Sequence, residues 1–382
     1  MNQTDTLIVG ASVAGLASAG QLKARGIDHL VIEKTDDVVT PWRNHYERLH
    51  LHTNKAMSVL AHRKYDKGVG TYPTRLQVID YFDQYRNALD IRPHFATEAT
   101  SIERRGDWWI TETTKGRFES NNVIIAMGPY GKPRRVEFKG MESFPGTIVH
   151  SSAYKSGRAF KGQKVLVVGF ANSACELAID LHEQGALPSM AVRSAVNVIP
   201  RDILGIPILQ LALLLSVLPP RLADRLNAPL MRLLIGDIRK LGLRKLPYGP
   251  LEQIQRVQGV PVLDIGTLKL IRQGHIRIFG DIDRIDGRVV HFSDGKQEAF
   301  DAIVAAIGYD KGFEGSVLKV DRTRIEDLRH PVARQSHFGK DGLYFCGFWI
   351  APTGQIREIA RDAFKIATHI SRSARSSSIA AA

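Results

Sequence analysis

Short apolar runs recur along the chain, and several of them end in a glycine. The first run, at residues 6–9, leads into a turn at 10–15, a segment of helical composition at 16–25 and a second apolar run at 30–33. This order of strand, glycine-rich turn, helix and strand predicts a βαβ unit. The N-terminus of such a helix offers free N–H groups and a partial positive charge, so it can bind a pyrophosphate.

The first turn fits the G-x-G-x-x-G pattern of dinucleotide-binding proteins at all but one position. Its residues are Gly10, Ala11, Ser12, Val13, Ala14 and Gly15. Serine replaces the middle glycine and adds a hydroxymethyl group where the backbone approaches the phosphates. Glu33 lies 18 residues after Gly15, close to the spacing of about 20 residues at which an acid accepts hydrogen bonds from the adenosine ribose.

The same pattern occurs a second time, 159 residues later when the first glycines of the two turns are compared. An apolar run at 164–168 leads into a turn, a helical segment at 175–184 and an apolar run at 189–193. The residues of this second turn are Gly169, Phe170, Ala171, Asn172, Ser173 and Ala174. Two such units predict an α/β fold with two dinucleotide-binding, Rossmann-like domains.

The residues at the ends of the two units indicate that the units bind different nucleotides. Arg193 and Ser194 stand where the first unit has Glu33. A guanidinium group can pair with a 2′-phosphate, whereas a carboxylate accepts hydrogen bonds from ribose hydroxyls. We therefore expect FAD in the first unit and NADPH in the second, although the methyl group of Ala171 crowds the second turn.

The C-terminal part of the chain indicates a return to the first domain. Apolar runs at 302–309 and 342–347 precede a helix predicted from 356 to about 371, which Gln355 opens. This helix either directs its N-terminal dipole at a flavin ring or is an ordinary packing helix. We expect the Ser- and Ala-rich tail, 373–382, to be disordered.

These patterns predict two domains, one interrupted by the other. The FAD-binding domain comprises 1–155 and 296–382, and the inserted NADPH-binding domain comprises 156–295 with an apolar insertion at 203–246.

Composition excludes several classes of protein. The chain has 382 residues, of which 44% are hydrophobic and 24% charged, which is typical of a globular protein. Its two cysteines, Cys175 and Cys346, lie too far apart in sequence for a C-x-x-C dithiol, and no Cys/His cluster suggests a metal site. The chain opens directly into an apolar strand rather than a leader, so we expect a reduced, cytoplasmic protein.

The net charge of +13 favours anionic partners. Because the basic residues are scattered and no nucleic-acid-binding module is recognisable, we expect no nucleic acid and assign the charge to nucleotide cofactors, acidic substrates or a membrane surface.

Residues 144–154 resemble the F-x-G-x-x-x-H-x-x-x-Y fingerprint of the flavin-containing monooxygenases, and they lie between the two turns as in that family. Tyr154-Lys155 stands where the related Baeyer–Villiger enzymes carry Trp-Pro. Two further motifs of the family resemble 126–128, which ends at Gly128, and 306–309, but both lack the family's threonine.

The second half of the chain is most similar to the YUCCA-type plant enzymes, and the resemblance covers nearly all of residues 4–370. The segments that carry it are 186–189, 196–205, 249–252 and 261–267. This resemblance implies an FAD enzyme that is reduced by NADPH, captures O₂ as a hydroperoxide at the flavin 4a carbon and oxidatively decarboxylates indole-3-pyruvate. The alternatives are N- or S-oxygenation of a small substrate, an uncoupled NADPH oxidase and a non-catalytic nucleotide-binding module.

The resemblance also implies roles for two residues outside the turns. Thr53-Asn54 matches the place where relatives have polar residues beside flavin and oxygen, so Asn54 is the candidate catalytic residue. Trp42 matches a tryptophan near the flavin phosphates. An ordinary loop residue is the alternative for each.

An apolar run at 203–218 is too short to span a bilayer and contains Pro207. Four interpretations remain: a lid over the substrate, a peripheral membrane contact helped by the basic stretch 221–245, a homodimer interface, or a plain buried helix pair. Relatives have an apolar insertion at this place, which favours the lid.

Overall fold

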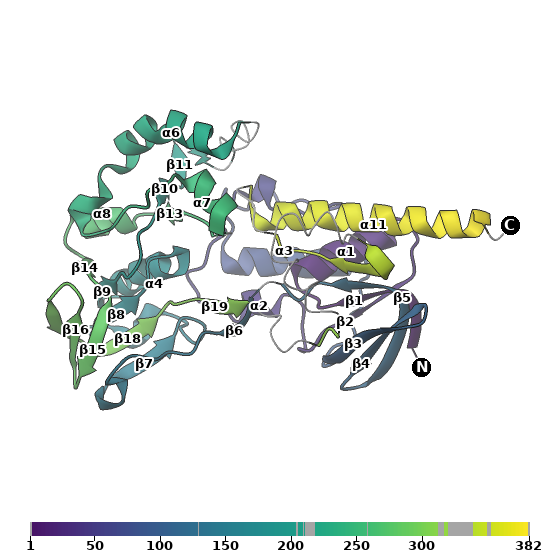
Figure 1. Cartoon of the computed structure of the whole chain (residues 1–382), viewed down its shortest axis with the longest axis horizontal. Helices are drawn as coiled ribbons and strands as arrows, with labels where there is room; N and C mark the ends of the chain where they lie inside the picture. The colour runs from purple at the N-terminus through teal and green to yellow at the C-terminus, as the bar shows by residue number, and fades with distance from the viewer. Residues whose placement is uncertain are drawn as a thin grey trace. The chain divides into compact units, whose positions relative to one another are not determined.

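A computed structural model of the chain forms two compact units (Figure 1). Unit 1 comprises Met1–Asn44, Thr53–Lys132 and Lys311–Ala382, and unit 2 comprises His45–His52 and Pro133–Asp310. The structure describes residues 2–128, 130–203, 205–208, 210, 218–257, 259–311, 317–319, 339–349 and 353–380.

Unit 1 is built on a six-stranded sheet of order β2-β1-β5-β4-β3, with β20 also pairing with β5. Its strands are β1 (Asn2–Val9), β2 (His29–Ile32), β3 (Ala99–Arg105), β4 (Trp108–Thr113), β5 (Gly116–Ile125) and β20 (Leu343–Phe345). The long strand β5 has two partners on one side: its first half pairs with β4 antiparallel and its last three residues pair with β20 in parallel. The segment after residue 310 therefore completes a sheet that begins at residue 2.

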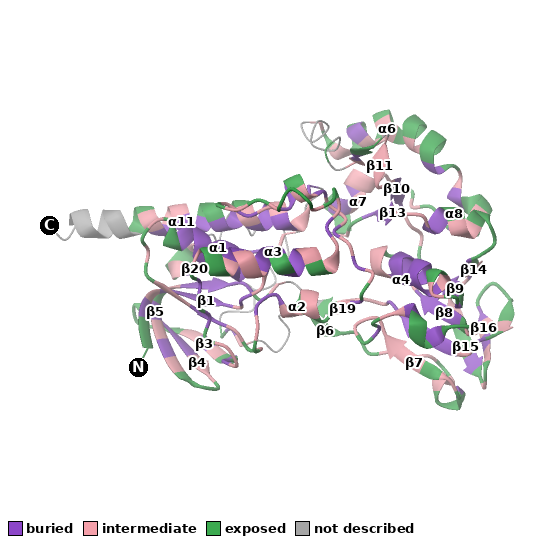
Figure 2. Ribbon diagram, turned by 180° about the vertical axis from the view of Figure 1, so that it is seen from behind, coloured by how far each residue is buried: buried purple, intermediate pink, exposed green. Residues whose placement is uncertain are grey.

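Three helices lie on one face of this sheet (Figures 1 and 2): α1 (Val13–Lys23), α3 (Arg75–Ala88) and α11 (Gln355–Ala380). Helix α1 contacts β1 and β2, and α3 and α11 pack on α1. Every residue of α1 except Lys23 is buried, as expected for a helix that is apolar on all sides. Gly20 permits the close approach of α3, because a Cβ there would lie 2.1 Å from the Tyr85 hydroxyl oxygen.

Unit 2 contains a fully parallel five-stranded sheet of order β14-β9-β8-β18-β7. Its strands are β7 (Thr147–His150), β8 (Lys164–Val168), β9 (Leu187–Ala191), β14 (Arg277–Phe279) and β18 (Ala302–Ala305). Helix α4 (Asn172–Glu183) joins β8 to β9. A three-stranded antiparallel sheet, β15 (Ile282–Asp286), β16 (Val289–Phe292) and β17 (Gln297–Ala299), shares with the parallel sheet a core in which Phe279 stacks on Phe292 at 4.4 Å between ring centroids.

The remaining elements are short. In unit 1 they are α2 (Thr40–Arg43), η1 (Lys55–Met57) and η5 (Lys340–Gly342). In unit 2 they are η2 (Met141–Ser143), η3 (Gly157–Phe160), β10 (Val198–Pro200), β11 (Asp202–Ile203), β12 (Ile206–Pro207), α6 (Pro220–Ile235), η4 (Ile238–Leu241), α7 (Pro250–Val257), β13 (Val262–Asp264) and α8 (Thr267–Arg272). The chain passes between the units at 44/45 and 52/53, and again within β6 (Tyr130–Pro133) and β19 (Tyr309–Lys311), which form a two-stranded sheet.

The predicted α/β fold with two Rossmann-like halves is confirmed. β1-α1-β2 and β8-α4-β9 are both parallel βαβ units with directly paired strands. The divisions predicted near 155 and 296 compare with divisions at 132 and 310 in the structure, because β7 and β18 pair with each other in the sheet of unit 2. Which unit binds which cofactor stays a prediction at this point.

The tail prediction is wrong for most of its length, because α11 continues to Ala380. Alanine and arginine favour helix, and no Gly or Pro occurs after Gly354 to end it. Most of the apolar run 203–218, namely 204, 209 and 211–217, lies outside the described residues.

Candidate functional site

The first glycine turn follows β1 at the carboxyl edge of the sheet of unit 1. Gly10 has φ +105°, a conformation that favours glycine. A Cβ on Gly15 would lie 1.9 Å from the Gly10 carbonyl oxygen, and one on Gly10 would lie 3.0 Å from that of Ala126. The turn is therefore tight, and it brings the backbone N–H groups of the first turn of α1 to the sheet edge, where Ser12, the N-cap residue, provides no side-chain cap.

Glu33 fixes the turn from the end of β2. Its Oε2 accepts a hydrogen bond from the Ala11 N–H at 2.7 Å, and its Oε1 accepts from the N–H and hydroxyl of Thr35 at 3.0 and 2.9 Å. Glu33 and the turn thus lie together, as the sequence motif requires. The carboxylate is held by three donors in the position where a ribose hydroxyl is expected.

The segment with Trp42 is anchored to the same turn. The Val39 N–H donates to the Ala11 carbonyl at 3.3 Å, and Val39 has φ +47°, which is strained for a β-branched residue. Trp42 follows on α2 and is half-buried. The Arg75 guanidinium holds α2 by donating to the Arg43 carbonyl at 2.8 Å.

Asn54 lies in a buried loop with one unused hydrogen-bond donor. It is 4% exposed. Its Oδ1 accepts from the Met57 N–H at 2.9 Å and caps η1, but its Nδ2 has no partner. A buried amide without a partner is costly, so this donor marks a place where a bound group can accept a hydrogen bond.

The Asn54 loop adjoins the beginning of α11. A Cβ on Gly354 would lie 2.6 Å from Cγ2 of Thr53, and Gln355 Nε2 donates to the Gly347 carbonyl at 2.8 Å. Gly347 in turn abuts α1, because a Cβ there would lie 3.2 Å from the Cβ of Ala14. Two helix N-termini and the Asn54 loop therefore gather at one edge of the sheet. Gly128, with φ +76°, ends the loop that follows β5 at this edge.

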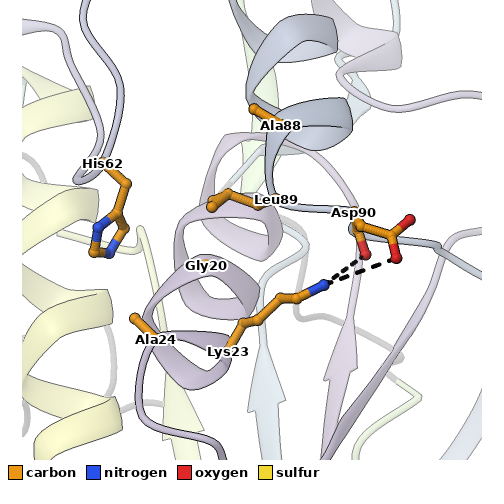
Figure 3. A pocket seen from close by; sticks show the side chains of 7 residues that line it. All are labelled: Gly20, Lys23, Ala24, His62, Ala88, Leu89 and Asp90. Atoms are coloured by element: carbon orange, nitrogen blue, oxygen red, sulfur yellow. Dashed lines mark hydrogen bonds and ion pairs between the residues drawn. The ribbon is translucent and has the colours of Figure 1, made fainter.

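These features suit a dinucleotide that carries a flavin. The glycine turn admits phosphates against the backbone, the N-terminus of α1 lacks a side-chain cap, and the Asn54 amide lacks a partner. A pocket of about 270 Å³ lies at the other end of α1, beside Lys23, His62 and Asp90 (Figure 3), and so does not belong to this site. The Lys23 ammonium donates there to the Asp90 carbonyl at 3.1 Å.

The second turn repeats the geometry of the first in unit 2. Gly169 has φ +119°, and a Cβ there would lie 2.7 Å from the Ala306 carbonyl oxygen. Phe170 and Ala174 are buried, and Ala171 is exposed at the N-cap of α4. Asn172 has a structural contact, because its Oδ1 accepts from the Leu263 N–H at 2.8 Å.

Arg193 and Ser194 are exposed just after β9. The Arg244 guanidinium donates to the Arg193 carbonyl, and the Val196 N–H donates to the Arg244 carbonyl at 2.8 Å. Two arginines therefore adjoin the end of β9. Sequence reasoning missed Arg244, because only a pairing across about fifty residues of sequence brings it there.

An acidic face of α4 is the largest feature that the sequence motifs did not reveal. Buried Glu176 accepts hydrogen bonds from the Tyr46 hydroxyl at 2.6 Å and contacts His52 Nε2 at 2.8 Å. Glu183, two turns along, pairs with Arg48 at 2.8 and 2.9 Å. Segment 45–52 is thereby fixed along α4. The signal in the sequence is acids at the i, i+4 and i+7 positions of an otherwise apolar helix.

The third acid, Asp180, holds the fingerprint. It accepts from the Tyr154 hydroxyl at 2.5 Å and from the Gly157 N–H at 2.8 Å. Burial, then the neighbouring carboxylate, raises the pKa of Tyr154 well above its usual range, so it remains a donor. His150 Nε2 lies 3.0 Å from the Gly308 carbonyl oxygen. The fingerprint residues thus connect α4 to the 306–309 motif.

The chemistry of the remaining reactive groups is limited. Both cysteines are free and buried, and burial raises the pKa of Cys175 and disfavours its thiolate. Among the residues that the structure describes, no group of His, Cys, Asp or Glu has the arrangement of a metal site.

Comparison with known proteins places the chain in a family. Residues 7–201 match the pyridine nucleotide-disulphide oxidoreductase family. The chain is 36% identical over 348 residues to the indole-3-pyruvate monooxygenase YUCCA1 of Oryza sativa subsp. japonica, which covers 90% of this chain and 86% of the relative. It is 37% identical over 358 residues to the indole-3-pyruvate monooxygenase YUCCA6 of Arabidopsis thaliana, with 90% and 85% covered.

Solved structures share the fold. A steroid monooxygenase bound to NADP superposes with a TM-score of 0.77 at 17% identity, covering 98% of this chain and 85% of that one. A flavin-containing monooxygenase from Stenotrophomonas maltophilia superposes with a TM-score of 0.69 at 17% identity, covering 98% and 100%.

Substituting Gly15 by alanine is expected to remove the FAD. The new Cβ would overlap the Gly10 carbonyl, so α1 must move away from the turn, at a cost of about 1–3 kcal/mol. The ratio of flavin to protein absorbance in the purified variant measures the loss. Gly68→Ala, where a Cβ meets nothing within 4 Å, is the control and should retain the flavin. A Gly15→Ala protein with full flavin content contradicts the assignment of this turn.

Substituting Arg193 by alanine is expected to raise KM for NADPH roughly tenfold or more, because a charged hydrogen bond contributes about 1.5–3 kcal/mol. KM for NADH should change less than about twofold, since NADH has no 2′-phosphate. Steady-state kinetics with each nucleotide measures both effects. Arg284→Ala on the three-stranded sheet is the control, and equal effects on both nucleotides would remove Arg193 from the site.

Proposed function

This chain belongs to the YUCCA family of flavin-dependent monooxygenases, and we propose that it oxidatively decarboxylates indole-3-pyruvate or a closely similar aromatic 2-oxo acid. The observation that carries the proposal is identity of 36–37% to indole-3-pyruvate monooxygenases over 90% of the chain. Both glycine turns lie within residues 7–201, the range that matches the pyridine nucleotide-disulphide oxidoreductase family. As a member of this family the chain is an FAD- and NADPH-dependent enzyme, and its partners are a small organic substrate and O₂.

The proposed reaction consumes indole-3-pyruvate, O₂, NADPH and a proton, and yields indole-3-acetate, CO₂, NADP⁺ and water. One oxygen atom enters the new carboxylate and the other leaves as water, while the bond between the keto carbon and the carboxylate breaks. When bound, FAD would supply the redox chemistry of this reaction, which is hydride acceptance from NADPH and activation of O₂.

The residues of unit 1 bind and orient the flavin in this proposal. The N-terminus of α1 and the turn 10–15 hold the pyrophosphate, and Glu33 accepts hydrogen bonds from the ribose. Trp42 and Gly128 adjoin the cofactor, and Gln355 places the N-terminus of α11 beside it. This arrangement rests on the shared sheet edge to which these elements converge.

Asn54 is the proposed catalytic residue. Its buried Nδ2 donor is free to hydrogen-bond to reacting oxygen or to the flavin, while its Oδ1 is fixed by the cap of η1. An amide that is fixed before the reaction loses little entropy when it binds the reacting group. The donor therefore orients oxygen and slows its release as peroxide.

The residues of unit 2 bind NADPH in this proposal. The turn 169–174 and the N-terminus of α4 receive the pyrophosphate, while Arg193, Ser194 and Arg244 form a cationic and hydrogen-bonding site for the 2′-phosphate. Support comes from the tight turn at Gly169 and from the proximity of the two arginines to the end of β9.

Location and further partners complete the proposal. A cytoplasmic location is supported by two cysteines that are both free. The two remaining partner expectations, a peripheral membrane contact and a homodimer, concern the apolar run 203–218, most of which lies outside the described residues.

The proposed function is tested with the purified, FAD-loaded protein, NADPH, air and indole-3-pyruvate. Indole-3-acetate equal to the NADPH consumed is the expected result. Peroxide equal to NADPH, without organic product, would make the protein an oxidase. Oxygenation of amines or sulfides in place of the keto acid would assign a different substrate class, and a protein that purifies without flavin would be a non-catalytic binding module.

Asn54→Ser is expected to uncouple the enzyme. Serine retains an oxygen that can cap η1 but removes the amide donor, so indole-3-acetate formed per NADPH should fall several-fold, by the roughly 1–3 kcal/mol of one hydrogen bond. The rate of flavin reduction by NADPH should stay within about twofold. Product and peroxide are measured together. If indole-3-acetate formed per NADPH is unchanged, the role of Asn54 is purely structural.

A further inference from the structure

The outward face of α6 holds the densest group of exposed apolar side chains in the described part of the chain. Twelve large hydrophobic residues are exposed in the described part of the chain as a whole. Five of them lie on this one helix of 16 residues: Leu222, Leu226, Leu230, Leu233 and Leu234. Leu226 is 62% exposed and Leu233 is 81% exposed. Figure 2 shows the exposed colour along this helix.

Four of the exposed leucines lie on the side of α6 opposite its packing face. At 3.6 residues per turn, Leu222, Leu226, Leu230 and Leu233 fall on one stripe. The buried Ile235 and the partly buried Asp224 and Met231 face the opposite side, whereas Ala223 and Leu234 lie at the boundary between the two. This stripe, which we call the leucine stripe, is therefore additional to the packing face. A core requirement does not explain it.

Cationic side chains border the leucine stripe on one side. Arg221, Arg225 and Arg232 fall together next to it, and the latter two have no ion-pair partner among the residues that the structure describes. Asp224, the single acid of α6, is turned toward α7, where it accepts from the N–H groups of Leu251 and Glu252 at 3.1 and 2.9 Å. The outward surface of α6 is thus apolar and positively charged.

The charge extends beyond the helix. Residues 221–245 contain seven Lys and Arg residues and two Asp residues. Arg239 pairs with Asp237 at 2.9 Å, while Lys240 and Lys245 are exposed. None of the helices in the described ranges is long and apolar enough to cross a bilayer. A short helix with leucines on one side and arginines on the other is typical of a helix that lies in the plane of a membrane interface.

We propose that α6 docks the protein on an anionic lipid surface. The leucine stripe enters the boundary between headgroups and acyl chains, and Arg225 and Arg232 contact the anionic headgroups. Lipid is favoured over a second copy of the chain because a two-fold dimer through this face brings together two positively charged surfaces. No acidic side chain borders the stripe on α6 to compensate them.

Sedimentation with large unilamellar vesicles tests the proposal on the FAD-loaded, full-length protein. Vesicles of phosphatidylcholine alone are compared with vesicles that contain about one third phosphatidylglycerol, at about 0.05 M and about 1 M NaCl. Binding to the anionic vesicles is expected, with a large loss at high salt.

Two double variants and one control separate the contribution of the leucines to vesicle binding from that of the arginines. Leu226→Gln with Leu233→Gln should weaken vesicle binding roughly tenfold or more. Arg225→Gln with Arg232→Gln should weaken it by roughly fivefold per charge removed. Leu76→Gln removes a leucine that is equally exposed, at 65%, on α3, and should bind like the parent protein. Unchanged flavin absorbance verifies that each variant is folded.

Four results would overturn the proposal. The first is a parent protein that does not sediment with anionic vesicles at low salt. The second is an α6 leucine variant that binds as well as the parent. The third is a dimer in sedimentation velocity that the leucine variant abolishes while vesicle binding is unaffected, which would assign the face to a second copy. The fourth is a higher KM for indole-3-pyruvate in the leucine variant with unchanged vesicle binding, which would assign the face to substrate entry. If the leucine variant does not fold, the arginine variant and the salt series still show whether α6 binds anionic lipid.

Discussion

The carbonyl oxygen of Gly10 and the α-carbon of Gly15 approach so closely that no side chain fits between them, and much of unit 1 depends on this contact. It determines where α1 begins, and thereby brings the first N–H groups of that helix to the carboxyl edge of β1. The Glu33 carboxylate supports the turn from β2. The beginning of α11 and the Asn54 loop then close the same edge, so elements from three parts of the chain share one small volume.

The equivalent constraint in unit 2 is electrostatic as well as steric. Besides its own glycine turn, α4 carries three acids on one side, and these bind segment 45–52 and the fingerprint residues around Tyr154. A helix that begins at a proposed nucleotide site thus also holds segment 45–52 within unit 2, and the chain returns to unit 1 at Thr53. The same helix serves both the proposed nucleotide site and the packing of unit 2.

The sequence patterns predicted those features of the fold that are formed by residues close together in the chain. Both βαβ units, their turns and the spacing to Glu33 follow from residues close in sequence, because a glycine turn and a helix start need only their neighbours. Long-range pairings were not predictable. Arg244 reaches the end of β9 only through pairing of 196 with 245, and Glu176 acquires its role only when segment 45–52 docks on α4. The extension of α11 to Ala380 was not predictable from apolar packing, because residues 373–382 are rich in Ser and Ala, and only their helix propensity favours it.

The division of the chain has a consequence for biosynthesis. Unit 2 is complete once residue 310 has been made, whereas unit 1 still lacks β20, which pairs with β5, and α11, which packs on α1. On a ribosome that extends the chain toward its C-terminus, β1 is therefore made long before the elements that complete its unit. Until then the side of α1 that α11 covers is exposed, so this interval is when unit 1 is most open to aggregation.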